Sequence, residues 1–356
     1  MRRMPAEFEK HMGTILIWPV RAGSWPYGGK DAQEVFKILA NTISKTEKVF
    51  MCCKNNDFDN VNNIFKDNDS VVVLNIDSDD SWARDIGPTF IDNDGTITGV
   101  DWKFNAWGGD FDGLYKDYDS DDKFASEFCS NLNLNTIDAH PFVLEGGSIH
   151  VDGEGTLITT EACLLSPGRN PSLTREQIEE NLNKYLGIKK VIWLPNGILG
   201  DETNEHVDNI CCFNKPGEVI MSWTDDTTDP QHDVCVRNYE ILTNSTDCMG
   251  RKIKVHKIPL PRNPVRITAD DLDGFVFEEG EDIREVGEKL AASYANFYIA
   301  NEAVLVPQFD DPNDAVAVSI LSEIFPDRTI YPIAARAIIV GGGNIHCITQ
   351  QIPYGG

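Results

Sequence analysis

The sequence predicts an α/β fold built from repeated modules. Apolar, strand-like runs alternate with amphipathic, helix-like segments along the whole chain, a pattern typical of βα units rather than of separate helical and sheet domains. In addition, two short motifs each occur twice, in alternating order. Together these observations favour ββαβ modules arranged around a pseudo-symmetry axis.

The alternation can be followed element by element. Apolar runs of strand length recur along the chain, and the segments between them place apolar residues at helical spacing. Thr174, followed three positions later by Gln177, predicts a capping box at the start of one helix. The expected strands are 14–18, 48–52, 70–76, 190–194, 218–223, 253–258, 303–307 and 328–333, and the expected helices are 31–45, 58–66, 122–133, 174–185, 230–242 and 312–324.

The internal similarity involves two pairs of segments. Residues 145–151, Glu-Gly-Gly-Ser-Ile-His-Val, resemble residues 341–347, Gly-Gly-Gly-Asn-Ile-His-Cys, and each is predicted to follow an apolar strand, at 141–144 and 337–340. Asp85, shortly before Phe90, likewise matches Asp208, shortly before Phe213. Because the two similarities alternate along the chain, duplication of a module explains them better than chance.

Length and composition allow an ordinary globular protein, with 356 residues, 41% of them hydrophobic and 25% charged. No low-complexity linker divides the chain, and the acidic stretch 268–288 is interpreted as a surface excursion rather than a domain boundary. The N-terminus lacks the apolar run of a signal peptide, and no window resembles a membrane span. We therefore expect one domain, residues 1–356, in the cytoplasm.

The net charge of −26 bears on possible partners. It argues against nucleic acid and membrane surfaces, whose phosphates would be repelled, and it suits a cationic substrate; solubility alone also accounts for it. The nine cysteines are odd in number and include no CxxC motif. Most of them are interpreted as buried packing groups in a reducing compartment.

Polar residues concentrate in four segments where a plain core would not place them. Residues 80–88 carry several charges between two apolar runs, Glu145 lies at a strand end, and Cys347 follows a glycine run. His206 and Asp208 are two positions apart, a spacing that directs both side chains to one face of an extended segment. Each segment alone has an ordinary structural explanation, such as a turn, a local ion pair or a core thiol. Only the four segments taken together indicate a catalytic site.

A Cys–His pair together with carboxylates points to a particular substrate charge. The thiolate attacks an sp² carbon while the imidazole moves protons. An ester or amide would develop an oxyanion, which requires N–H donors, whereas carboxylates hold a planar guanidinium. The pattern therefore favours a cationic electrophile. A metal site made of His206, Asp208, Asp85 and Glu145 is the alternative, but no known metal-binding motif supports it, and no cofactor is expected.

An ordered series of motifs resembles the agmatine deiminases over almost the whole chain. The resemblance implies the pentein fold, a five-bladed pseudo-symmetric α/β propeller with its active site on the axis, and a homo-oligomer, a dimer or larger. The motifs are 4–7 with 18–19, 82–90, 105–109, 144–150, 205–209, 223–230 and 342–347.

The resemblance also implies roles for individual residues. Cys347 would be the nucleophile, His206 the general acid and base, Asp85 and Asp208 the guanidinium-binding carboxylates, and Glu145 a third active-site carboxylate. Agmatine and water would give N-carbamoylputrescine and ammonia through an amidino-cysteine intermediate, a step of putrescine and polyamine biosynthesis.

Related deiminases differ in the group that their substrates carry at the end opposite the guanidinium. Agmatine ends in an ammonium, and we expect Trp82 to pack along its aliphatic chain and Glu202 to bind the amine. A free-arginine or peptidyl-arginine deiminase of the same fold is the nearest alternative, and free arginine would need a cation for its carboxylate. Arg84 is available, but Asp80 and Asp85 are expected to neutralise it. A propeller that serves only as an interaction module is the alternative outside enzymes.

Overall fold

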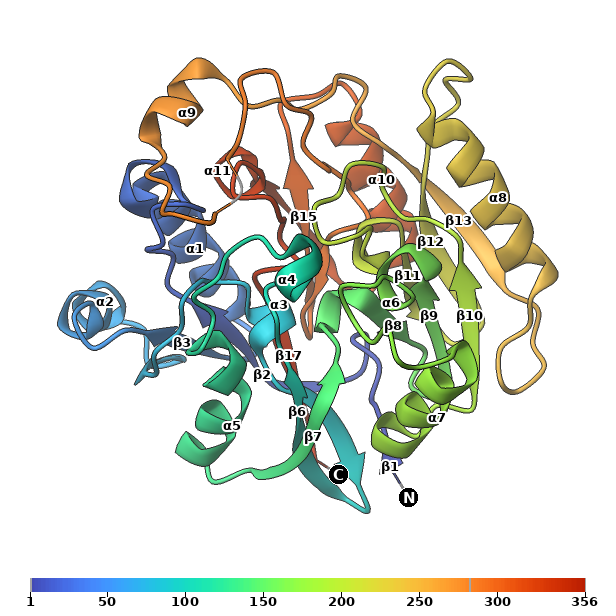
Figure 1. The fold of residues 1–356 in the computed structure, drawn as a ribbon, viewed down its shortest axis with the longest axis horizontal. Coiled ribbons are helices and arrows are strands. Elements are labelled where there is room, and N and C mark those ends of the chain that lie inside the picture. The colour runs from blue at the N-terminus through green and yellow to red at the C-terminus, as the bar shows by residue number, and fades with distance from the viewer. Residues whose placement is uncertain (1, 282, 356) are drawn as a thin grey trace.

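The computed structural model describes residues 2–281 and 283–355. Within these ranges the strands form five small sheets arranged as blades around a central axis, and most of the longer helices lie at the periphery (Figure 1). The expected α/β propeller is therefore confirmed.

Three of the blades show the repeating ββαβ module in its simplest form. The first two strands are antiparallel, and the third lies parallel to the second after a helical connection. These blades contain β8 (Ile149–Val151), β9 (Thr156–Thr160), α6 (Glu161–Leu164), α7 (Arg175–Leu186) and β10 (Lys190–Leu194); β11 (Cys211–Lys215), β12 (Glu218–Trp223), α8 (Gln231–Asn244) and β13 (Lys254–Pro259); and β14 (Tyr298–Ile299), β15 (Ala303–Gln308), α10 (Asp314–Ile324) and β16 (Thr329–Ala334).

The other two blades use the ends of the chain and close the ring. The C-terminal strand β17 pairs with β2, near the N-terminus, and β1 pairs with β5. One blade contains β17 (Gln350–Pro353), β2 (His11–Ile17), α1 (Lys30–Ile43), β3 (Lys48–Cys53), α2 (Phe58–Phe65) and β4 (Val71–Asn75); the other contains β1 (Arg2–Arg3), β5 (Thr89–Asn93), β6 (Thr96–Lys103), α5 (Asp121–Asn131) and β7 (Asn135–Val143).

Local sequence explains where the helices begin and which face they bury. The Thr174 side chain accepts a hydrogen bond from the Gln177 N–H, and Gln177 Oε1 accepts one from the Thr174 N–H, so the predicted capping box of α7 is confirmed. Gly187, with φ 74°, caps the C-terminal end of the helix. Helix α1 buries residues at helical spacing, among them Phe36 and Leu39.

One predicted strand is wrong. Residues 337–340 belong largely to a short helix, α11 (Arg336–Ile339), which packs against α1 and buries Ile338 and Ile339. A brief apolar run fits a buried strand and a buried helical turn equally well, so its pattern cannot separate them.

The short turns that precede the first strand of each blade determine where the site lies. Helix α3 (Ala83–Ile86) leads into β5, η2 (Gly146–Ser148) into β8, η3 (Val207–Asn209) into β11, and a loop ending at 349 into β17. First strands of neighbouring blades contact each other, β8 with β11 and β5 with β17. The turns therefore meet at the axis. The remaining short elements are η1 (Pro26–Gly29), α4 (Gly109–Asp112) and α9 (Ala269–Gly274). None of the described helices combines the length and apolar character that crossing a membrane requires.

Candidate active site

A pocket opens where these turns converge. Its wall includes six of the seven residues that the sequence singled out, and the seventh, Glu145, lies directly behind it against His206. The six are Trp82, Asp85, Glu202, His206, Asp208 and Cys347.

The pseudo-symmetry of the propeller explains this convergence. Asp85 lies in α3, Glu145 caps η2, His206 caps η3, which contains Asp208, and Cys347 lies in the loop before β17. Each of these turns enters the first strand of a different blade. The duplicated motifs therefore place chemically different side chains at equivalent positions around one axis.

Cys347 is a nearly buried thiol, with 8% of its surface exposed. Its Sγ lies 3.5 Å from Asn296 Oδ1 and 3.7 Å from Asp208 Oδ2. Burial, together with the charges of Asp208 and Asp85, raises the pKa of Cys347 well above its ordinary value. The group is therefore a protonated thiol while the pocket holds no cation.

His206 lies between two carboxylates. Its Nδ1 is 3.9 Å from Asp85 Oδ2 and its Nε2 is 3.5 Å from Glu145 Oε2. Burial opposes the charged imidazolium, but Asp85, a second thiol at Cys163 and Glu145 raise the pKa of His206 well above its ordinary value. The imidazole consequently carries a proton that it can donate.

Glu145 is kept anionic by a buried ion pair. Arg169 Nε lies 2.7 Å from Glu145 Oε1, and neither side chain is exposed. Burial alone would raise the pKa of Glu145, yet Arg169 and His206 bring it below its ordinary value. Arg169 is itself fixed by hydrogen bonds to Asn204 Oδ1 at 2.7 Å and the Thr203 carbonyl at 2.9 Å. The ion pair thus gives His206 a stable carboxylate partner.

Asp85 and Asp208 are held differently. Asp85 accepts hydrogen bonds from the Gly147 N–H at 2.8 Å and Trp107 Nε1 at 2.9 Å, and burial together with the neighbouring carboxylates raises its pKa to about 6, despite His206. Asp208 Oδ2 accepts a bond from His346 Nδ1 at 2.8 Å, whereas its buried Oδ1 has no hydrogen-bond partner among the described residues. A planar, cationic ligand would complete the bonding of both carboxylates.

Gly147 leaves the space that these side chains need. A Cβ at this position would lie 2.7 Å from His206 Nδ1, 2.9 Å from Asp85 Oδ1 and 3.0 Å from Asp208 Oδ2. All three contacts are shorter than ordinary packing allows. The glycine pair in the 145–151 motif is therefore a requirement for assembling the site.

The mouth of the pocket contains an aromatic wall and paired charges. Trp82 stacks on Trp25, with ring centroids 4.9 Å apart, and its Nε1 donates to Asp80 Oδ2 at 2.9 Å. Glu202 Oε1 accepts a hydrogen bond from Arg284 Nη2 at 2.7 Å, so its charge is already partly compensated.

Part of this mouth comes from the acidic stretch 268–288. Glu281, Arg284 and Glu288 line the pocket, and Glu281 forms an ion pair with Arg21. The stretch is therefore a wall of the site as well as a surface excursion.

Arg84 differs from the expectation. It does not pair with Asp80 or Asp85; its Nη2 lies 3.1 Å from Glu7 Oε2 and its Nη1 donates to Gln351 at 2.6 Å. Arg84 is not among the residues lining the pocket. Adjacent side chains in the short helix α3 point in different directions, so Asp85 faces the pocket while Arg84 faces the interior behind it.

Several residues at the site were not identified from the sequence. They include Asn296, which precedes β14 and thus occupies in the fifth blade the place that Cys347 and Asp208 occupy in theirs. The repeat pattern could have located Asn296, but Arg169 and Arg284 reach the site from distant loops and carry no local signal.

Potential metal-ligating groups lie close together at two places among the described residues. One contains Glu145, Cys163 and His206, and the other contains Glu7, His150 and His346. In each the carboxylate is already engaged by an arginine, Arg169 or Arg84. The arginine charge beside each group disfavours a cation there.

Comparison with known proteins agrees with this geometry. The model of the Porphyromonas-type peptidyl-arginine deiminase family matches residues 3–353. A protein of Selenomonas ruminantium described as a "putative agmatine deiminase" is 56% identical over 98% of this chain and 95% of its own length. The solved agmatine deiminase of Enterococcus faecalis superposes with a TM-score of 0.96 at 43% identity, covering 100% of this chain and 96% of that one.

A more distant structure shares the fold alone. The N-terminal domain of ArgZ, an arginine dihydrolase from Cyanobacteria, covers 96% of this chain and 98% of its own with a TM-score of 0.52 at 10% identity. The five-bladed arrangement is thus the pentein fold, and the chain belongs to the Porphyromonas-type peptidyl-arginine deiminase family, with close relatives named as agmatine deiminases.

Proposed function

We propose that this protein hydrolyses agmatine to N-carbamoylputrescine and ammonia, with Cys347 as the nucleophile. The single observation that carries the proposal is the position of the Cys347 thiol beside Asp208 in a pocket that Asp85 also lines. Carboxylates at this position oppose the oxyanion of an ester or amide, but they neutralise a guanidinium and hold it by paired hydrogen bonds.

The charges of the site suggest the order of events. When the guanidinium binds between Asp85 and Asp208, its positive charge offsets the two carboxylates that raise the pKa of Cys347. The thiol then releases its proton, and the thiolate attacks the guanidinium carbon to form a C–S bond. His206 gives a proton to one nitrogen, the C–N bond breaks, and ammonia departs.

The second half of the reaction returns the enzyme to its starting state. Water attacks the amidino carbon and passes a proton to His206, which regains its charge. The C–S bond then breaks, the remaining proton rejoins the Cys347 sulfur, and a urea group stays on the product. The proton released at the first step ends on ammonia as ammonium. Glu145, fixed by Arg169, keeps His206 oriented through both transfers.

The amine end of agmatine is assigned to the mouth of the pocket. Trp82 offers an aromatic face for the aliphatic chain, and Glu202 offers a carboxylate, although its Oε1 is shared with Arg284. Lining acids outnumber lining arginines at this mouth, which favours an ammonium over a carboxylate. The names of close relatives agree with this choice.

Two measurements test the proposal. Ammonia release from agmatine should exceed that from arginine or a peptidyl-arginine substrate; faster turnover of either alternative would replace agmatine as the substrate. Cys347→Ala should abolish turnover without unfolding the protein, and intact-mass spectrometry of the wild-type enzyme quenched during turnover should detect an amidino adduct on Cys347. Activity near wild type in the Cys347→Ala variant would rule out covalent catalysis and leave the interaction-module alternative open.

We further infer the context in which the enzyme works. Residues 1–356 would form one catalytic domain, a reading supported by the ring closed between β17 and β2. The nine cysteines all lie within the described residues and are free, which suits a reducing cytoplasm. A homo-oligomer, no nucleic acid or membrane partner, and a role in putrescine and polyamine biosynthesis complete the proposal.

A further inference from the structure

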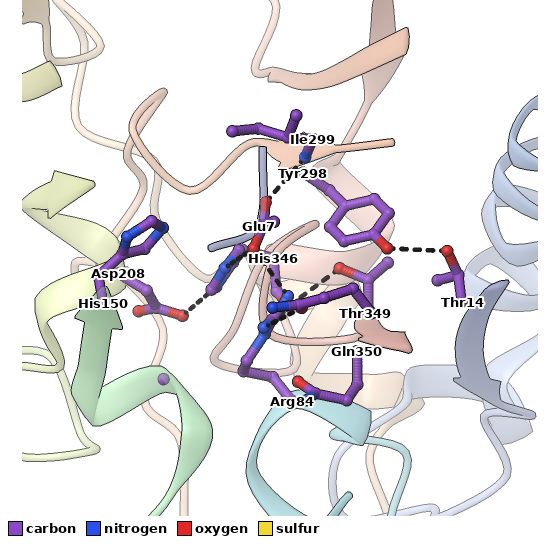
Figure 2. A network of polar contacts seen from close by, with 12 residues as sticks. Glu7, Thr14, Arg84, His150, Asp208, Tyr298, Ile299, His346, Thr349 and Gln350 are labelled. Atoms are coloured by element: carbon purple, nitrogen blue, oxygen red, sulfur yellow. Dashed lines mark hydrogen bonds and ion pairs between the residues drawn. The ribbon is translucent and has the colours of Figure 1, made fainter. Parts of the chain in front are cut away.

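A cluster of buried charges lies beside Asp208 (Figure 2), and its residues are not among those that line the pocket. It contains Glu7, Arg84, His150 and His346, and each is at most 5% exposed. Glu7 belongs to the N-terminal motif, and the two histidines occupy equivalent positions in the duplicated segments 145–151 and 341–347. The proposed reaction uses none of these side chains directly.

His346 bridges two carboxylates. Its Nδ1 lies 2.8 Å from Asp208 Oδ2 and its Nε2 lies 2.7 Å from Glu7 Oε2. Ionised carboxylate oxygens only accept hydrogen bonds, so both ring nitrogens must donate. His346 is therefore an imidazolium held between Glu7 and Asp208.

Glu7 is fixed as an anion by three donors. Its Oε1 accepts a hydrogen bond from the Ile299 N–H at 2.8 Å, and its Oε2 is shared by His346 and Arg84. Burial opposes ionisation, but His346 and Arg84 bring the pKa of Glu7 well below its ordinary value. Glu7 thus anchors His346 to a strand of another blade, β14.

The remaining neighbour of the imidazolium is neutral. His150 stacks on His346 with ring centroids 6.0 Å apart, and its Nδ1 accepts a hydrogen bond from the Phe213 N–H at 3.2 Å. Burial lowers the pKa of His150 to about 4, and the charges of His346 and Arg84 act in the same direction. The charged groups facing His346 are therefore Glu7, Arg84 and Asp208. The formal charges of these three groups and of the His346 imidazolium sum to zero.

We propose that Glu7 and His346 are positioning residues that aim Asp208 at the substrate, an inference that rests on the proposed function. His346 engages Oδ2 of Asp208, which leaves the buried Oδ1 without a partner among the described residues. That oxygen is then available to a guanidinium N–H. The same cluster also steadies the nucleophile, because Arg84 Nε donates to the His346 carbonyl at 3.3 Å and the Arg84 N–H donates to the Cys347 carbonyl at 3.1 Å.

The chain supplies a matched control for the cluster. Glu47 and His11 form a second buried ion pair, 3.2 Å apart, with side chains 0% and 1% exposed. This pair bonds to Thr14, to the Asn301 N–H and, through His11 Nε2 at 2.7 Å, to the main-chain carbonyl of Glu7. A Glu47→Gln variant therefore removes a buried Glu–His interaction that reaches the cluster through the main chain of Glu7 and bonds to neither the Glu7 side chain nor Asp208.

The first experiment compares pH profiles of kcat/KM for agmatine in the wild type, Glu7→Gln and Glu47→Gln. Loss of the Glu7 anion lowers the pKa of His346, so the ring loses its proton as the pH rises and Asp208 loses its cationic partner. We expect Glu7→Gln to gain a descending alkaline limb, with activity on it reduced about 10- to 100-fold, by analogy with the losses found when a group that orients a metal ligand by a hydrogen bond is removed. Glu47→Gln should keep the wild-type profile. A Glu7→Gln profile parallel to that of the wild type, or the same new limb in Glu47→Gln, overturns the proposal.

A second pair of variants separates positioning from packing. Asn at position 346 can place an amide donor near the position of Nδ1, whereas Leu cannot, so His346→Asn should retain at least tenfold more activity than His346→Leu. Equal losses in two variants that both remain folded by circular dichroism would contradict a positioning role.

A third measurement does not depend on turnover. Nitrogen-15 spectra of histidine-labelled wild-type protein, assigned with His346→Asn, should show both ring nitrogens of His346 protonated at neutral pH, and Glu7→Gln should shift its titration to lower pH. A neutral His346 in the wild type overturns the inference even if agmatine is hydrolysed. Absence of agmatine hydrolysis with a charged His346 would instead overturn the proposed function.

Discussion

Replacing Gly147 with alanine adds one methyl group at the centre of the site. Gly147 has no positive φ, so an alanine fits its backbone, and the perturbation is purely one of space. The new carbon would contact His206, Asp85 and Asp208 at once, at 2.7–3.0 Å. Among the glycines of the described residues, only Gly147 has these three side chains as the nearest neighbours of an added Cβ.

The size of the effect follows from these distances. Ordinary contacts begin at 3.4 Å, so the shortest contact, 2.7 Å to His206 Nδ1, requires a displacement of about 0.7 Å. A misplacement of about 1 Å in an active site costs roughly 100-fold in rate, equivalent to about 2.7 kcal/mol of transition-state stabilisation. We expect kcat/KM for agmatine to fall by about 30- to 100-fold, with an overpacking cost to stability of about 1–3 kcal/mol.

The control is Gly99→Ala in β6, a residue that does not line the pocket. A Cβ there would lie 2.4 Å from Cys129 Sγ and 3.0 Å from Pro88 Cβ, so this variant is overpacked to a similar degree. Initial rates of ammonia release and urea unfolding curves should be measured for both. Wild-type kcat/KM in Gly147→Ala, or an equal loss in Gly99→Ala at matched stability, would refute the geometric reasoning.

Three further predictions concern charge. Because the pKa of Asp85 is raised to about 6, the carboxylate is present above that pH and lost below it; kcat/KM should fall as the pH drops through about 6, and a flat profile in this range would contradict the assignment. Arg169→Met leaves Glu145 buried without its cation and should lower the free energy of unfolding by about 3–5 kcal/mol; a urea midpoint close to that of the wild type would show that the ion pair contributes little. Thiolate absorbance at neutral pH, measured as the difference between wild type and Cys347→Ala, should appear only when an amidine analogue is bound, and thiolate in the free enzyme would refute substrate-assisted ionisation.

The regular elements were largely predictable because each is specified by its own residues. The strands at 190–194 and 218–223 agree with β10 and β12 at both ends, since four residues of each segment are apolar or aromatic and each includes a Val–Ile pair. The two-residue strands β1 and β14 carry no such pattern, because their pairing depends on a neighbouring strand. The run 337–340, most of which belongs to helix α11, was predicted as a strand. Four apolar residues are too few to distinguish the two-residue period of a strand from the 3.6-residue period of a helix.

The residues of the candidate site could be predicted from the sequence, but their charge states could not. Trp82, Asp85, Glu145, Glu202, His206, Asp208 and Cys347 were singled out from motifs, and the structure brings all of them together at one pocket. The charge state of each group was not accessible from the motifs. Arg169 beside Glu145 and His346 beside Asp208 are separated from them by 24 and 138 positions in sequence, and pKa values depend on distance in space.

The sequence by itself determined the α/β modules, their duplication, and the set of a thiol, an imidazole and carboxylates that indicates a guanidinium substrate. Those conclusions depend on residue type, spacing and family resemblance. Only the tertiary structure decided which cationic side chain pairs with which carboxylate. Arg84 pairs with Glu7 rather than with Asp85, Arg284 donates a hydrogen bond to Glu202, and His346 bridges Glu7 and Asp208. These ion pairs join residues that are far apart in the sequence, because closure of the ring brings side chains from different blades within hydrogen-bonding distance. A local sequence pattern therefore cannot predict them.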